Sequence, residues 1–204
     1  RPWVAAANDP STFFTKPFSY NTGINIQGGN EKGTFALGYT RIDDKGMLPN
    51  SHITKDLANF AGTLKLTNRL SVSASLNYTG VSGKGRYGTG YDPSNPAQNF
   101  RQWWETNVDL KELKDAYFRT GQNTTLNWAD PSDEVNGLYP IFWNNPYFDR
   151  YQNYETDTRT RYLGNITANY KITDWLNVMG RVALDHYDEL QEELEGLHGC
   201  NQDG

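Results

Sequence analysis

The chain has 204 residues, of which 36% are hydrophobic and 21% charged, with a net charge of −5 and a mean hydropathy of −0.77. A chain this polar has no run of about eighteen apolar residues, so we expect neither a transmembrane helix nor the core of a signal peptide. Lysine and arginine are scattered along the chain, whereas nucleic-acid binding needs cations clustered on one face. The composition therefore does not support a nucleic-acid partner.

Strict alternation of apolar and polar residues is the strongest pattern, and it predicts β-strands. In the fourth such segment Leu70, Val72, Ala74, Leu76 and Tyr78 alternate with serine, asparagine and threonine. None of the apolar-side positions in any of these segments is charged, so one face of the expected sheet meets a dry environment. The predicted strands lie near 18–27, 34–41, 58–67, 70–80, 158–172 and 175–186.

A dry environment is either the core of a soluble β-sandwich or the hydrocarbon of an outer membrane. Sandwich strands usually have about 5–6 residues, whereas a tilted membrane strand needs about 9–11, which several of these segments reach. Short turns at 28–33, 67–69 and 173–174 alternate with long connections at 42–56 and 81–157, as in an up-and-down membrane barrel. The pattern favours the membrane.

Aromatic residues at the predicted strand ends point the same way, because tyrosine and tryptophan concentrate where lipid headgroups meet hydrocarbon. Tyr170 and Trp175 flank a short turn. The aromatics that we place at the long-loop ends of their strands are Phe18, Tyr20, Tyr39, Phe60, Tyr78 and Tyr162.

Several stretches, in a fixed order from about Phe13 to Asp185, resemble one family. They are the Phe13-Phe14 pair, INIQGGNEKGTFALGYT (24–40), DKGMLPNS (44–51), the helical QWWETNVDLKELKDAY (102–117), WNNPYF (143–148) and YKITDWLNVMGRVALD (170–185). Together they are similar to the β-barrel portion of the SusC/RagA class of TonB-dependent outer-membrane transporters of Bacteroidetes. Residues 189–204 have no counterpart that we can place.

The resemblance implies an all-β fold: a partial transmembrane antiparallel barrel of about six up-and-down strands, with a long extracellular loop, 81–157, that contains short helices. Residues 1–204 would be a fragment of a larger barrel with a plug. The resemblance also implies import of oligosaccharides or peptides, outer-membrane lipid around the barrel, a SusD-like surface lipoprotein as partner, and energy from the TonB system through parts absent here. No cofactor or enzymatic activity is implied.

The long loop carries four of the six tryptophans, and a strandless segment of that length is uncommon unless it has a function. Aromatic faces cover the C–H surface of sugars, and amides bond hydroxyls. As candidate substrate-binding residues we name Trp128, Tyr139, Trp143 and Asn144. Trp103, Trp104 and Tyr147 are candidates for packing the loop or binding a partner, a role that the first set could also have. On the polar strand face, residues including Asn165 and Arg181 would line the lumen.

Other motifs in the sequence give weaker indications of function. The GKGRYG run at 83–88 lacks a following helix and is interpreted as a flexible loop. His198 and Cys200 belong to no metal motif, and a calcium site in the run 130–137 departs from the EF-hand spacing, so no metal or catalytic residue is proposed. We expect Asp109 and Glu112 to open a helix as a capping box.

Two other functions stay open. The first is a soluble secreted β-sandwich whose loop tryptophans bind carbohydrate. The second is a β-rich glycoside hydrolase, which would need Asp149 or Glu155 opposite Glu105 at hydrolase spacing.

Overall fold

The computed structural model describes residues 3–86, 88–92, 95–130, 132–133 and 139–196. They form one open antiparallel sheet with the strand order β1-β2-β3-β4-β5-β6. The strands are β1 (Phe18–Asn30), β2 (Gly33–Lys45), β3 (His52–Lys65), β4 (Leu70–Arg86), β5 (Tyr154–Lys171) and β6 (Asn177–Leu194). Each strand pairs with its neighbour in sequence, so the predicted up-and-down order is confirmed.

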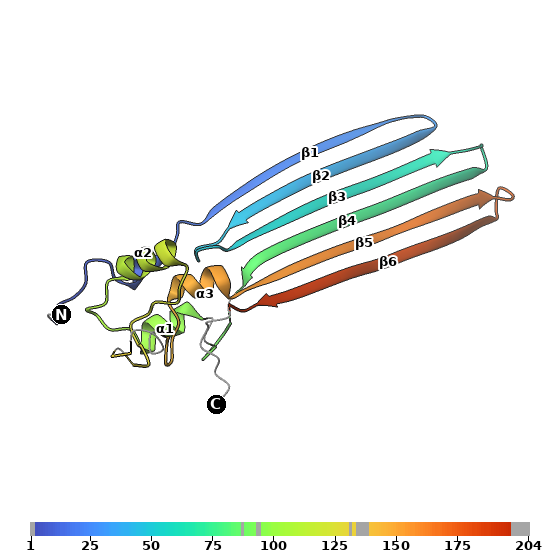
Figure 1. Cartoon of the computed structure of the whole chain (residues 1–204). Coiled ribbons are helices and arrows are strands. Elements are labelled where there is room, and N and C mark those ends of the chain that lie inside the picture. The colour runs from blue at the N-terminus through green and yellow to red at the C-terminus, as the bar shows by residue number, and fades with distance from the viewer. Residues whose placement is uncertain (1–2, 87, 93–94, 131, 134–138, 197–204) are drawn as a thin grey trace.

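Three short turns join the strands at one end of the sheet (Figure 1). In the β1–β2 turn the side chain of Asn30 accepts hydrogen bonds from the backbone N–H groups of Lys32 (2.8 Å) and Gly33 (3.1 Å). The Thr67 hydroxyl does the same for Arg69 and Leu70 before β4. Short polar side chains thus satisfy the turn backbone, as is usual for asparagine and threonine at such positions.

Helices gather at the other end of the sheet (Figure 1). They are the short 3₁₀ helix η1 (Pro10–Phe13) and the helices α1 (Pro96–Gln102), α2 (Leu110–Thr120) and α3 (Pro146–Gln152). We call the described residues of 3–17, 46–51 and 88–153 the helical cap. No helix in the described ranges is long and apolar enough to cross a bilayer.

The helices differ in part from the expectation. The helical stretch expected over 102–117 is helical only from Leu110, because α1 ends at Gln102 and the chain turns before α2 begins, at the second helical piece that Asp109 was expected to open. The capping role of Asp109 is confirmed: its side chain accepts a hydrogen bond from the backbone N–H of Lys111 (2.9 Å). At the other end of α2, Gly121 adopts φ +70°, a left-handed conformation that glycine tolerates best.

The strands are longer than predicted at the cap end, so two expected loops shrink. The connection between β2 and β3 covers only 46–51 rather than 42–56, and the one between β4 and β5 covers 87–153 rather than 81–157. Residues 83–86 of the GKGRYG run lie in β4, with a bulge at Lys84/Arg86, so the interpretation as a flexible loop is wrong for them. Residues 189–194 complete β6, while Tyr87, His198 and Cys200 lie outside the described residues.

Candidate functional site

The register of the sheet aligns the apolar stretches of all six strands into one uncharged surface, the apolar belt. One row across it runs from Ile26 through Leu37, Phe60, Leu76 and Gly164 to Leu184. A parallel row runs from Gly28 through Phe35, Gly62, Ala74 and Ile166 to Val182. These side chains are open, with 59% of Ile166 and 76% of Val182 exposed. None of the described residues covers the belt.

A row of three tyrosines, Tyr39, Tyr78 and Tyr162, borders the belt on the side of the helical cap. Tyr39 and Tyr78 direct their hydroxyls away from the belt. The Tyr39 hydroxyl donates to the Asp56 carboxylate (2.5 Å), and that of Tyr78 reaches over Gly80, where an added Cβ would lie 2.7 Å from its oxygen. Apolar ring edge toward the belt and polar tip outward is the orientation that tyrosine takes at a membrane interface.

Phenylalanine rings behave differently from the tyrosines. Phe60, which we expected at the rim, lies inside the belt, and its ring leans over Gly62 toward the middle. Phe35 likewise covers Gly28 on the neighbouring strand. The correction for Phe60 has a simple cause: β3 begins six residues earlier than predicted, so this position is not near the strand end.

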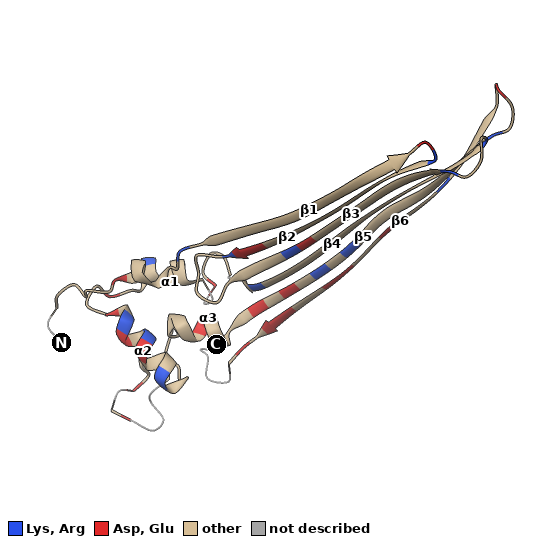
Figure 2. Cartoon of the chain, turned by 90° about the horizontal axis from the view of Figure 1, so that it is seen from above, with Lys and Arg blue, Asp and Glu red and all other residues tan. Residues whose placement is uncertain are grey.

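Beyond the tyrosine row the same face becomes charged. Arg41 pairs with Asp43 (3.0 Å) and Asp56 (3.2 Å), and His186 contacts Asp188 (3.0 Å). Much of the acidic and basic colour on the strands in Figure 2 lies toward the cap end. Arg181, in the other half of β6, is on the polar face. The belt face thus becomes charged just beyond the tyrosine row in β2, β3 and β6.

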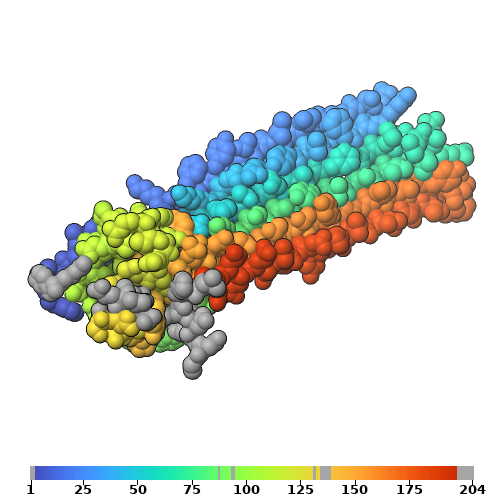
Figure 3. Space-filling view, viewed as in Figure 1, coloured from blue at the N-terminus to red at the C-terminus, as the bar shows by residue number. Residues whose placement is uncertain are grey.

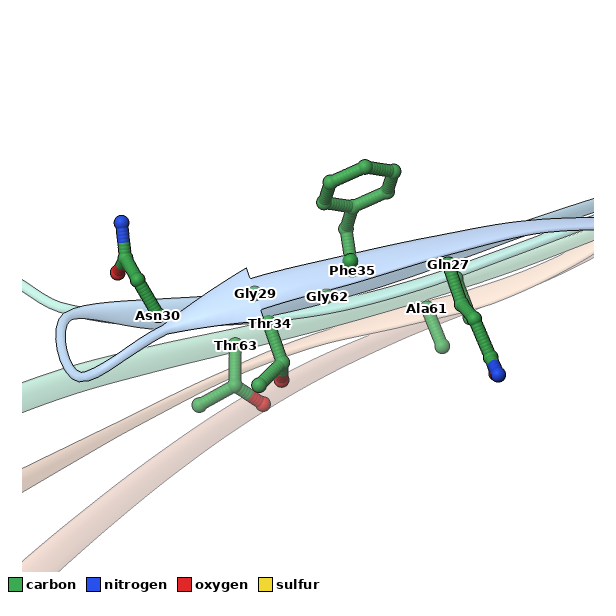
Figure 4. Close-up of a pocket in the computed structure, with 10 residues that line it drawn as sticks. Gln27, Gly29, Asn30, Thr34, Phe35, Ala61, Gly62 and Thr63 are labelled. Atoms are coloured by element: carbon green, nitrogen blue, oxygen red, sulfur yellow. The ribbon is translucent and has the colours of Figure 1, made fainter.

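The opposite face is polar within the height of the belt. Figure 4 shows the alternation near the β1–β2 turn, with Phe35 on one side and Gln27, Thr34 and Thr63 on the other. Further along this face, the Asn165 amide donates to the Ser75 hydroxyl (2.7 Å). Arg181 donates to the Thr167 hydroxyl (3.0 Å). The polar residues thus bond across strands as well as to the backbone ladder.

The helical cap has the buried core that the sheet lacks. Phe13 is 1% exposed, and its ring makes edge contacts with Phe100 (5.1 Å) and Tyr147 (5.2 Å). Leu48, Leu110, Tyr117 and Phe148 complete the cluster. Phe13 comes from the segment before β1, Leu48 from the β2–β3 connection and the other members from the β4–β5 connection. Three separate segments of the chain therefore share one core. Figure 3 shows the cap as a compact mass at one end of a thin slab of strands.

A network of buried amides organises the cap around Asp149. The carboxylate accepts from the side-chain amides of Asn144 (2.7 Å) and Asn153 (3.0 Å). The side-chain amide of Asn123 donates to the side-chain oxygen of Asn144 (2.7 Å). Asn145, fully buried, donates to the backbone oxygens of Leu113 and Thr124. Burial raises the pKa of Asp149 to about 7, although the two amide hydrogen bonds oppose this.

Arg150 fastens the cap to the strand ends. Its guanidinium is buried and donates to the backbone oxygens of Pro49 (2.9 Å) and Gly85 (2.6 Å), while Asn50 donates to the Arg150 carbonyl (2.7 Å). Desolvation lowers the pKa of Arg150 from its ordinary value. Gly85 has φ +76°, and a Cβ there would lie 2.5 Å from the Asn50 oxygen, so only glycine fits this bulge.

Of the candidate substrate-binding residues, the structure leaves some open to solvent and buries others. Trp143 lies half-buried beside Trp103, with ring centroids 6.4 Å apart, and Trp103 is 57% exposed. Trp128 forms an isolated β-bridge with Pro140, and the neighbouring backbone N–H of Ala129 donates to the carbonyl oxygen of Tyr139 (3.0 Å). The Tyr139 side chain is exposed. Asn144 is buried in the amide network, so its side chain supports the cap from within.

The candidates for loop packing divide in the same way. Tyr147 belongs to the core, and burial raises its pKa to about 12. Trp104 packs against that core through Phe100 (5.1 Å between ring centroids). Trp103 is instead exposed, beside the half-buried Trp143.

The carboxylates named for a hydrolase lie in unlike places. Asp149 is buried, Glu155 lies in β5 opposite Glu193, and Glu105 is exposed between α1 and α2. Within the described ranges no group of three or more histidine, cysteine or acidic residues could hold a metal ion. Residues 131 and 134–137 of the candidate calcium run lie outside these ranges.

Arg150, Asn145 and Asp149 are structurally central, and the sequence analysis did not single out their roles. A signal was present, because the NNP tripeptide before α3 is a typical helix start, with Asn145 as the capping residue and Pro146 at the first position. Comparison with models of known protein families gives no match to this chain, and no curated protein matches its sequence.

Proposed function

We propose that the chain is part of a TonB-dependent outer-membrane transporter of the SusC/RagA kind, which imports oligosaccharides or peptides. The observation that carries the proposal is the apolar belt, because six strands in register present one open, uncharged surface that ends at a tyrosine row and then at charged residues. Outer-membrane barrels have such a band, bordered by aromatic residues, toward lipid.

The strand dimensions support the proposal. From Leu70 to Tyr78 the strand rises about 27 Å, which at a tilt near 40° is about 20 Å across the bilayer, close to the roughly 25 Å band of known barrels. Among the described residues the outer strands β1 and β6 each pair on one side only, and six strands are too few to close a barrel around a substrate path. We infer that both edges continue into further strands of the whole transporter.

The helical cap fits the extracellular side on this proposal, and its exposed aromatics fit a substrate or partner surface. Trp103, Tyr139, Phe142 and Trp143 offer exposed or half-buried ring faces, and the backbone N–H groups of Phe142 and Trp143 donate to the Asn127 side chain. A saccharide ring or an apolar peptide side chain would cover those faces. A SusD-like lipoprotein is the partner that we propose for the rest of this surface, and TonB coupling would act through the plug of the whole protein.

The rival function is a soluble sandwich with carbohydrate-binding loops. It would need a second sheet over the apolar belt, and the described residues form a single sheet. An experiment on the whole chain separates the two: circular dichroism and sedimentation in plain buffer and in detergent micelles. We expect aggregation in buffer and a monodisperse β-signal in micelles. A monodisperse β-rich monomer in buffer would contradict the transporter and favour the sandwich.

A further inference from the structure

Two lysines and a histidine stand next to one another on the belt face, at the cap ends of β2, β3 and β4. Lys45 is directly opposite His52, and His52 is directly opposite Lys84. Neighbouring strands lie about 4.8 Å apart, so the two lysines are about 10 Å apart with His52 between them. We call Lys45, His52 and Lys84 the cation row.

No carboxylate neutralises the cation row within the part of the chain that the structure describes. The Lys84 ammonium lies 4.0 Å from the centre of the Tyr154 ring, on the side away from the belt. The acidic residues in the vicinity have other partners: Asp43 pairs with Arg41, and Asp157 pairs with Arg86 on the opposite face (3.2 Å). Glu192 lies two strands from Lys84, and Thr156 stands between them. The row is therefore arranged to meet an anion from outside.

The distance between the cation row and the apolar belt restricts which kind of anion can reach the row. Lys84 follows Tyr78 by six residues, which is about 20 Å along the strand and about 15 Å along the bilayer normal at a tilt near 40°. The headgroup layer of an ordinary phospholipid is only about 5–8 Å thick on each side of the hydrocarbon. A phospholipid phosphate would lie below the cation row.

The intervening residues also disfavour an anion at the lower level. Between the tyrosine row and the cation row the belt face carries Asp43, Asp56 and Asp188, with Arg41 as the cation among them. A phosphate at that depth would meet net negative charge. The anion must therefore belong to a molecule that reaches past this level.

We propose that the cation row binds phosphate groups on the saccharide headgroup of a glycolipid whose acyl chains cover the apolar belt. A sugar headgroup of several residues spans the distance that a simple headgroup does not, and its phosphates are acceptors for two lysines. The inference rests on the proposed membrane function, because that function places lipid on the belt face.

The test measures binding of the whole chain to phosphatidylcholine vesicles, plain or doped with one of two glycolipids. One is lipopolysaccharide with a phosphorylated core oligosaccharide, and the other is lipid A without that core. We expect the core-bearing glycolipid to bind about tenfold or more tightly than lipid A. The double variant Lys45→Gln/Lys84→Gln should lose that preference, since each lysine near an anionic surface contributes about a factor of five.

The matched control is Lys55→Gln/Lys65→Gln, which removes the same charge from the polar face of β3 and should keep the preference. If plain vesicles bind, either of two results would overturn the inference: equal binding of both glycolipids, or an equal loss of the preference in the two double variants. Displacement of the glycolipid by millimolar inorganic phosphate would reassign the row to free anions. Failure to bind even plain vesicles would overturn the proposed function as well.

Discussion

In the helical cap, Phe13, Leu110 and Asn145 are almost completely buried, whereas β1 and β6 are exposed along their whole length. The cap is stabilised by its own apolar core and by buried hydrogen bonds. The sheet has its backbone ladder and contacts between neighbouring strands, but no second layer of described residues packs on its apolar face. An uncharged face predicted from a sequence therefore does not identify the molecule that covers it. The stability of the sheet should depend on lipid, whereas that of the cap should not.

The largest effect is expected in the cap core. Phe13→Ala should cost about 3–5 kcal/mol of cap stability, because the ring fills a closed aromatic cluster. Phe14→Ala is the matched control, since Phe14 is 38% exposed and should lose much less. Denaturant unfolding of the chain in micelles, followed by tryptophan fluorescence, measures both. Similar losses for the two variants would mean that the cap core does not carry the stability.

On the sheet, Leu76→Lys tests whether lipid meets the apolar belt. A lysine there should cost about 2–4 kcal/mol near the bilayer midplane. Asn77→Lys, on the adjacent residue of the polar face, should cost little. The measurement is reversible unfolding from phospholipid vesicles. Equal tolerance of both lysines would contradict a membrane position for the belt.

Protonation of Asp149 should make the stability of the cap depend on pH. Its pKa is about 7 in the folded protein against an ordinary value of 3.8, so between these values the folded cap holds a proton that the unfolded chain has released. Cap stability should therefore be highest at low pH and fall by about 2–3 kcal/mol from pH 5 to pH 8. Asp149→Asn should remove most of this dependence. A wild-type profile that rises with pH would refute the assignment.

The smallest stability effect is expected at the exposed aromatics. Trp103→Ala should change cap stability by less than about 1 kcal/mol, because more than half of the side chain is already in water. It should nevertheless weaken binding of a neutral oligosaccharide or short peptide about three- to tenfold. Trp175→Ala, at a short turn of the opposite end, is the control. Fluorescence titration in micelles with a panel of both ligand kinds provides the readout.

The strands within the belt could be predicted from the sequence, because apolar and polar residues alternate there, with Leu163 as an exception, and no residue on the apolar side is charged. Their cap ends could not, since the apolar residues change face beyond the tyrosine row. Ile42, Ile53 and Val81 point to the polar side, while Arg41 and Lys84 occupy the side of the belt. A search for one uninterrupted alternation therefore stops too early, although the backbone pairing continues.

The cap shows a different limit of sequence reasoning. The density of tryptophan and asparagine located a candidate surface, and the NNP tripeptide marked the start of α3. Which aromatics are exposed depends on contacts between distant segments, such as Phe13 with Tyr147 and Arg150 with Pro49. Local pattern carries no information about those pairs, so it could not show that Asn144 is buried and Trp103 exposed.

The long-range contacts of the cap also set an order of assembly. Asn8 donates to Asp109 (2.9 Å), and Arg150 donates to Pro49, so each bond joins residues about one hundred positions apart. Hairpins close over a few residues and form early, whereas closing such large loops is slow. The cap should therefore consolidate after β1 to β4 have paired. A chain arrested before α3 would show strand pairing while Phe13 is still accessible to solvent.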